Sequence, residues 1–160
     1  MQWYELQTSI GGIHVKNGLV GKGLSILNMC VEAIRTIGGE TCRSLVACYA
    51  QLGAQQAVLV KVPFKVIELE KEAIPYFEKA LDILERFREK NSIDRVKILI
   101  ELGSCYQLLY NESRLFKHLE KAIEYYSEGV SSPQLNSLME QHNRVRLRES
   151  LAVCYFWWGK

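Results

Sequence analysis

The stretch Glu101–Tyr106, which reads ELGSCY, decides the fold because versions of it occur three times in the chain. The other two copies are Ser44–Tyr49 (SLVACY) and Ser150–Tyr155 (SLAVCY). Each copy places Leu, a small residue, Cys and Tyr at the same offsets in an apolar segment with helical spacing, which predicts one buried helix face. A helix that recurs at intervals above about 30 residues indicates a helical solenoid, so we expect an all-α fold.

The composition is typical of a globular protein. With 160 residues, 48% of them apolar and 24% charged, the chain can form one domain with a real core. The formal charge is only +2 and basic residues alternate with acidic ones, so we expect no nucleic-acid partner. We interpret the basic run Arg144–Arg148 as a solvated helix face. No apolar run approaches the roughly 18 residues needed to cross a bilayer, and the amino terminus lacks signal-peptide order. We therefore expect no membrane association.

The cysteines indicate the cellular compartment. There are five of them, an odd number, and Cys48, Cys105 and Cys154 occupy the same position of the repeated motif. This arrangement suits small buried thiols in a reducing compartment better than a disulfide framework. We therefore expect a cytoplasmic location, with the nucleus as the alternative.

Residues 1–23 form a poorly defined amino-terminal segment that we separate from a helical repeat domain over 24–160. Asn17-Gly18 could close a short hairpin between residues 13–15 and 19–20, and a glycine-weakened helix fits this stretch equally well. Gly21-Lys22-Gly23 lacks the other residues of a phosphate-binding loop, so we expect no nucleotide site.

Six helices are expected after residue 23, with ends assigned from glycine, proline and capping signals. Two of these signals are the pair Gly38-Gly39, as a stop, and Pro75, which must fall in a first turn or cause a kink. The expected helices are 24–37; 40 to beyond 55, continuing to a break at Pro63; 66–90; 94–110; 112–128, after a break at Asn111; and a long last helix from Ser132-Pro133 through the third motif to about Trp158.

These residues resemble the tetratricopeptide-repeat family. The matching residues are Leu99, Leu102, Gly103 and Tyr106 for the first helix of a repeat, Leu115, Leu119 and Ala122 for its second, Ala73, Phe77 and Ala80 for another second helix, and Leu151, Ala152 and Tyr155 for another first helix. The resemblance implies antiparallel helical hairpins stacked as a right-handed solenoid. The motif recurs at intervals longer than the family period of about 34 residues. We therefore expect a divergent array with extended helices and one repeat in full register.

Catalytic chemistry is not expected. The three histidines, His14, His118 and His142, are scattered, and none lies at zinc-ligand spacing from a cysteine. Carboxylates alternate with lysines along the helices, as solvated pairs do. We therefore expect no enzyme activity, no metal and no cofactor.

The resemblance implies recognition of a protein or peptide partner. In such solenoids the first helices of the hairpins line a concave surface that receives an extended or helical segment. Carrying the inward positions over residue by residue gives the partner-binding candidates Arg43, Lys97, Ser104, Gln107, Arg146, Glu149 and Trp157. We therefore expect a non-catalytic scaffold or adaptor. Ala47 and Glu101 stand where a carboxylate-clamping subclass has Asn, so binding of chaperone tails is not expected.

The last motif supports an alternative. Leu151–Gly159 resembles the first helix of a hairpin without its second helix, and it would expose Phe156, Trp157 and Trp158. On this hypothesis the domain is part of a longer array, or a structural segment of a larger assembly whose exposed ends stack on further repeats. Self-association through the carboxy-terminal helix is a related expectation. A weaker hypothesis is a helical enzyme domain that uses the glycine-rich loop with Lys22 and a histidine.

Overall fold

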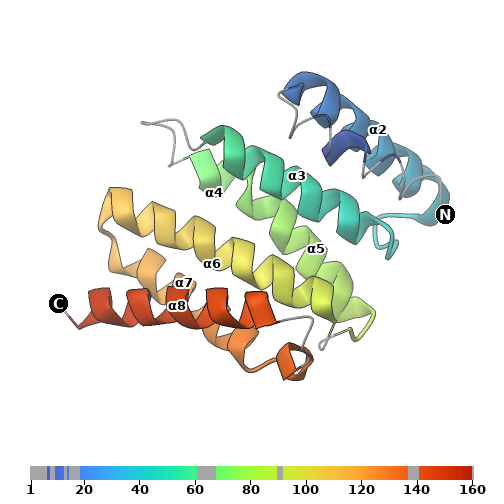
Figure 1. The fold of residues 1–160 in the computed structure, drawn as a ribbon. Helices are drawn as coiled ribbons and strands as arrows, with labels where there is room; N and C mark the ends of the chain where they lie inside the picture. The colour runs from blue at the N-terminus through green and yellow to red at the C-terminus, as the bar shows by residue number, and fades with distance from the viewer. Residues whose placement is uncertain are drawn as a thin grey trace. The chain divides into compact units, whose positions relative to one another are not determined.

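The computed structural model describes residue 7 and residues 10–12, 14, 19–60, 68–89, 92–136 and 141–159. Within these residues the regular structure is helical and no strand occurs (Figure 1). This result confirms the predicted all-α class. The chain divides into two compact units, Met1–Arg88 and Glu89–Lys160.

The first unit contains four described helices, and α3 packs against each of the other three. They are α2 (Val20–Gly38), α3 (Leu45–Val60), α4 (Leu69–Glu72) and α5 (Ile74–Arg86). Apolar residues at helical spacing on the facing sides of these helices form the core, as the sequence pattern predicts. The largest fully buried side chains are Leu27, Leu45, Leu52, Leu69, Phe77 and Leu84.

Glycine and proline determine two of the helix ends in this unit. Helix α2 ends at Gly38 because Gly39 has a φ of 78°, a left-handed value that favours glycine. This end and the place of Pro75 in the first turn of α5 confirm the predictions. Of the amino-terminal segment, residues 10–12, 14 and 20–23 are helical, whereas Asn17-Gly18, where a hairpin turn was the alternative to a helix, lie outside the described residues. The predicted break at Pro63 lies outside the described residues.

The predicted helix start at Glu40 is wrong. Residues 40–44 form turns instead, and α3 begins only at Leu45. The backbone N–H of Cys42 bonds to the carbonyl of Gly39 at 3.3 Å, and that of Leu45 bonds to the carbonyl of Cys42 at 2.9 Å. Tight turns therefore satisfy the backbone after the left-handed glycine, and the helix starts once they are complete.

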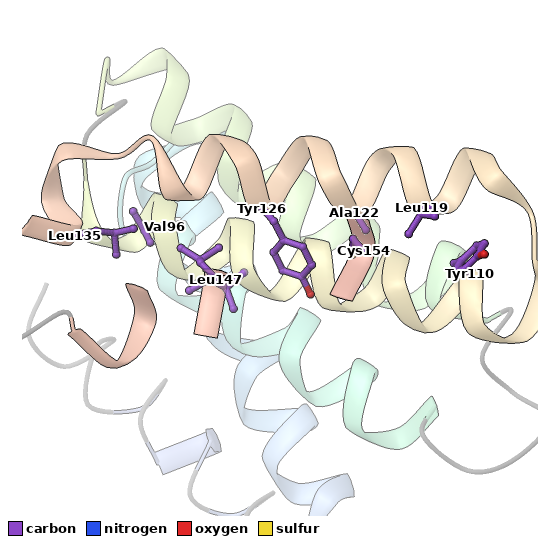
Figure 2. Packing of buried hydrophobic residues seen from close by; sticks show 9 residues of the cluster. Val96, Tyr110, Leu119, Ala122, Tyr126, Leu135, Leu147 and Cys154 are labelled. Carbon is purple, nitrogen blue, oxygen red and sulfur yellow. The ribbon is translucent and has the colours of Figure 1, made fainter. Parts of the chain in front are cut away.

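The second unit is a helical hairpin with a third helix packed against both members. Helices α6 (Ile93–Ser113) and α7 (Phe116–Val130) run antiparallel, and the turn η2 (Pro133–Asn136) precedes α8 (Gln141–Trp158) (Figure 1). Figure 2 shows their shared core, which is formed by Val96, Ile100, Tyr110, Leu119, Ala122, Tyr126, Leu135, Leu147 and Cys154.

The turn between α6 and α7 falls at Arg114, so the break predicted at Asn111 is wrong. Arg114 has a left-handed φ of 55°, and its N–H donates to the carbonyl of Tyr110 at 2.8 Å. Ser113 stabilises the turn, because its Oγ accepts from the N–H of Leu115 at 3.2 Å and bonds to Nδ1 of buried His118 at 2.9 Å. These bonds hold the turn three residues later than the asparagine suggests.

The start predicted for the long last helix, at Pro133, also differs from the structure. Pro133–Asn136 forms a 3-10 turn, and the α-helix begins at Gln141. Residues 137–140 between them lie outside the described residues. Helix α8 still contains the whole third motif. The environment of its motif residues can therefore be compared with that of the other two copies.

Candidate functional site

The three motif cysteines lie in the cores of the two units. Cys48, Cys105 and Cys154 are buried, and none of them forms a disulfide. Burial raises the pKa of the Cys154 thiol to about 11, because the thiolate is the charged form. The predicted small buried thiols are therefore confirmed, and Cys154 is neutral at physiological pH.

The motif tyrosines of the first two copies have equivalent partners. Tyr49 of α3 stacks on Tyr76 of α5, with ring centroids 6.2 Å apart and planes 28° apart. Tyr106 of α6 stacks on Tyr125 of α7, with centroids 5.6 Å apart and planes 23° apart. In both hairpins, a tyrosine of the second helix thus stacks on the motif tyrosine of the first helix.

The residue after each of these partner tyrosines packs on a glycine. A Cβ added to Gly53 would lie 2.9 Å from the ring of Phe77, and one added to Gly103 would overlap the ring of Tyr126. Figure 2 shows the Tyr126 ring projecting from α7 toward α6. Each second helix therefore carries two adjacent aromatic residues, which we call its aromatic pair: one ring stacks on the motif tyrosine and the other covers a glycine.

The third motif copy differs from the other two. Cys154 is buried, whereas Tyr155 is 54% exposed and Ala152 is also exposed. The prediction of an equivalent buried helix face in all three copies is therefore wrong at Tyr155. The physical reason is that no described helix brings an aromatic pair to this side of α8.

A connected polar cluster lies across α6 and α8. Arg146 Nη1 donates to Glu101 Oε1 at 2.9 Å, and its Nη2 lies 3.4 Å from Ser104 Oγ. The hydroxyl of Tyr126 donates to Ser104 Oγ at 3.2 Å and to Gln107 Oε1 at 3.0 Å. We name as the polar strip these partly exposed residues together with exposed Lys97: Lys97, Glu101, Ser104, Gln107 and Arg146.

The polar strip is accessible to solvent, and the buried Tyr126 holds two of its residues in place. The side chains of Arg146 and Glu101 are 40% and 36% exposed, so solvent or a ligand can reach their ion pair. Beneath them, burial raises the pKa of Tyr126, while its hydrogen bond to Ser104 acts in the opposite direction. The phenol therefore remains a hydrogen-bond donor and holds Ser104 and Gln107 in place.

Four of the seven predicted partner-binding residues belong to this strip: Lys97, Ser104, Gln107 and Arg146. Arg43 precedes α3 in the first unit and is not part of it. Glu149 is exposed on α8, outside the cluster of hydrogen bonds. Trp157 is half-buried, and its ring centroid lies 5.5 Å from the guanidinium carbon of Arg114.

Sequence reasoning missed two residues of this cluster, Glu101 and Tyr126. Glu101 was considered only as a mismatch to a carboxylate clamp. Its position gave a usable signal, because Lys97 and Glu101 lie four residues apart and share a helix face. The position of the Tyr126 hydroxyl depends on the packing of α7 against α6, which the sequence alone does not specify.

The first unit has an open pocket of about 240 Å³ between the turn after α2 and helix α5. Its charged residues are largely paired: Glu40 with Arg35, and Asp82 with Arg86 at 2.9 Å. The hydrogen bond from Arg35 lowers the pKa of Glu40. Lys79 lies over two tyrosine rings, 5.7 and 5.8 Å from their centroids. The pocket thus contains stabilising ion pairs and cation–π contacts, a different arrangement from the polar strip.

No family model matches the sequence, and no curated protein is significantly similar to it. Among the described residues, no group of three or more His, Cys, Asp or Glu side chains could hold a metal ion. No helix in the described part of the chain has the length and apolarity needed to span a membrane.

Proposed function

We propose that the protein is a non-catalytic adaptor that binds a segment of a partner protein along the polar strip of α6 and α8. The observation that carries this proposal is the position of Arg146. Its guanidinium reaches from one motif helix to Glu101 and Ser104 of another while remaining 40% exposed. Two motif helices thereby contribute to one accessible polar surface, the arrangement that a peptide-binding face requires.

A divergent tetratricopeptide-like arrangement of the hairpins is part of this proposal. Its support is that α8 packs on both α6 and α7, as the first helix of a following hairpin would. Further support comes from the repeated aromatic-pair contacts of Tyr49 and Tyr106. Buried thiols suit a reducing compartment, so we place the protein in the cytoplasm or the nucleus.

The chemistry of the strip favours an acidic, extended segment. Lys97 and Arg146 are cations, and a ligand carboxylate could take the place of Glu101 at the Arg146 guanidinium. The Gln107 amide and the Ser104 hydroxyl can bond to the backbone of an extended chain. A partner segment with one or two carboxylates next to an exposed backbone is therefore the expected ligand.

Selection from a library of random peptides tests this function. Peptides that bind the protein should be acidic, and Lys97→Glu or Arg146→Glu should weaken their binding about tenfold or more, because each replaces attraction with repulsion. The matched control is Lys117→Glu, which reverses an exposed lysine of α7 outside the strip. Selected peptides whose affinities are unchanged in both strip variants would contradict the proposal.

A structural segment of a larger assembly is the second candidate function. The observation that favours it is the apolar surface of α8, where Val153, Phe156 and Trp158 are all exposed. Large exposed apolar patches mark interaction surfaces. Such a segment would stack on further repeats or on a second copy through α8, and its association would be insensitive to reversal of Lys97.

A further inference from the structure

The face of α6 that receives α7 is known in detail. Val96 and Ile100 are each 1% exposed on this face, and Gly103 lies under the Tyr126 ring. Tyr106 stacks on Tyr125. Two positions three residues apart on this motif helix thus receive an aromatic pair from an antiparallel helix, and Val96 and Ile100 belong to the same buried cluster.

The same kind of contact occurs in the first unit. There α5 brings Tyr76 onto Tyr49 and Phe77 onto Gly53 of α3. The stacked tyrosine pair therefore occurs twice, whereas the second ring lies at a different position: Gly53 follows Tyr49 by four residues, and Gly103 precedes Tyr106 by three. In each case a helix with two adjacent aromatic residues covers a motif helix, one ring on the motif tyrosine and the next on a small residue.

Helix α8 has the same receiving face without an occupant among the described residues. Aligning the third motif with the second matches Val145 to Val96, Glu149 to Ile100, Ala152 to Gly103 and Tyr155 to Tyr106. All four α8 residues are exposed, Val145 to 51% and Tyr155 to 54%. We call Val145, Glu149, Ala152 and Tyr155 the α8 face.

The differences between the α8 face and the α7-binding face of α6 indicate which residues a helix bound to α8 should carry. Tyr126 bonds through its hydroxyl to Ser104 and Gln107, whose counterparts on α8 are Val153 and Phe156. A tyrosine hydroxyl would lack an acceptor there, so the second residue of the docking pair should be phenylalanine. In the first unit this residue is Phe77.

Glu149 requires a positive charge on the bound helix. It replaces the buried Ile100 at the centre of the face, and it forms no ion pair or side-chain hydrogen bond within the described residues. A helix antiparallel to α8 would pass over Glu149 about one turn after its aromatic pair. A lysine or arginine three or four residues after the phenylalanine would therefore pair with this carboxylate.

From these contacts we infer that the α8 face binds a helix of a partner protein with the order aromatic, phenylalanine and, three or four residues later, lysine or arginine. The recognition would be specific, because stacking on Tyr155, ring contact with Ala152 and the ion pair with Glu149 must coincide. The inference does not depend on the polar strip, which uses different residues of α8.

A stapled helical peptide with the sequence of residues 74–88 and the change Leu81→Lys is a suitable probe, since it carries Tyr76, Phe77 and a lysine four residues later. Stapling removes most of the entropic cost of forming the helix. We expect saturable binding to the whole protein by fluorescence anisotropy. Phe77→Ala in the peptide should weaken binding at least about tenfold.

Protein variants test the position of the peptide. Ala152→Arg fills the place of the ring and should abolish binding, and Glu149→Lys should weaken it about fivefold or more. A peptide with Leu81→Glu should regain affinity for the Glu149→Lys protein, a rescue that general loss of structure would not produce. Both protein changes are at exposed positions, so the fold should be retained.

The matched control is Lys117→Glu, a charge reversal at an exposed position of α7 outside the polar strip and the α8 face, which should leave peptide binding unchanged. Loss of binding in Arg146→Glu but not in Ala152→Arg would place the peptide on the strip and overturn the inference. Absence of binding at millimolar peptide would also overturn it. Sedimentation velocity distinguishes a second copy as occupant: a dimer that Ala152→Arg dissociates and that excludes the peptide would contradict the proposed helix.

Discussion

At the residue scale, Gly103 of α6 packs directly against the ring of Tyr126 of α7. A Cβ at Gly103 would overlap the ring, and the ring is held by the hydrogen bonds of its hydroxyl to Ser104 and Gln107. The glycine therefore allows the two helices to approach each other closely, and the aromatic ring fills the space that a side chain would take.

Gly103→Ala should lower the free energy of unfolding by about 1–3 kcal/mol, because the ring or the helix must move to admit the methyl group. The matched control is Gly21→Ala in α2, where no atom lies within 4 Å of the added Cβ. That change should raise stability by about 0.5–1 kcal/mol through helix propensity. Urea denaturation followed by circular dichroism measures both; a stabilised Gly103→Ala protein would contradict the packing.

The buried Cys154 thiol makes stability depend on pH in the alkaline range. Its pKa is about 11 in the folded protein, against 9.0 as the ordinary value. A raised pKa of an acid means that the unfolded chain releases the proton first. The contribution to stability is therefore complete below pH 9 and is lost as the pH rises to 11, in total about 2–3 kcal/mol.

Cys154→Ala should accordingly show a shallower fall of stability between pH 9 and 11 than the unmodified protein. The alanine lowers stability at every pH by leaving a small cavity, so the comparison uses slopes and not absolute values. Urea titrations at several pH values, with a reducing agent present, provide them. Parallel curves for the two proteins would show that the thiol is not shielded as described.

The motif cysteines illustrate what the sequence predicts well at this scale. Cys48, Cys105 and Cys154 were expected to be buried because they share a position in a repeated apolar pattern, and burial depends mainly on that pattern. The exposure of Tyr155 was not predictable in the same way. It depends on whether another helix covers α8, which the residues of the motif do not determine.

At the element scale, an ion pair between Arg95 and Glu128 joins α6 to α7. Nε and Nη2 of Arg95 lie 2.9 and 2.5 Å from Glu128 Oε1. Arg95 is buried, whereas the Glu128 side chain is 43% exposed. The guanidinium therefore depends on this carboxylate more than an exposed cation would.

Glu128→Gln should lower stability by about 1–2 kcal/mol, since it removes the charge that faces buried Arg95; solvent screening of the half-exposed carboxylate keeps the loss below that of a fully buried pair. The matched control is Glu124→Gln, which breaks the exposed pair with Lys121 on the same helix. Its effect should stay within about 0.5 kcal/mol. Equal effects in thermal denaturation would contradict the difference in burial.

Helix ends show where prediction from sequence succeeds and where it fails. Gly39 and Pro75 mark real ends because their backbone preferences are intrinsic to the residue. The turn at Arg114 has no such marker, because a non-glycine residue adopts a left-handed φ there. Hydrogen bonds of Ser113 with the next helix stabilise this turn, and they form only when α7 is in place.

At the scale of the whole molecule, the candidate site follows from helix packing more than from the motif. The sequence identified Lys97, Ser104, Gln107 and Arg146 as surface residues of two motif helices. The connection of Ser104, Gln107 and Arg146 through Glu101 and Tyr126 requires α6, α7 and α8 to meet at one place. The residue pattern of each single helix cannot predict this connection, because it contains no distances between helices.

The two compact units give the last prediction. Each unit has its own buried core, so a packing defect in one should increase local unfolding mainly in that unit. Hydrogen exchange followed by mass spectrometry can compare Gly53→Ala with Gly103→Ala, since both place a methyl group against an aromatic ring. Gly53→Ala should speed amide exchange in α3 and α5, and Gly103→Ala should speed it in α6, α7 and α8. Faster exchange throughout the chain in both variants would instead indicate one cooperative folding unit.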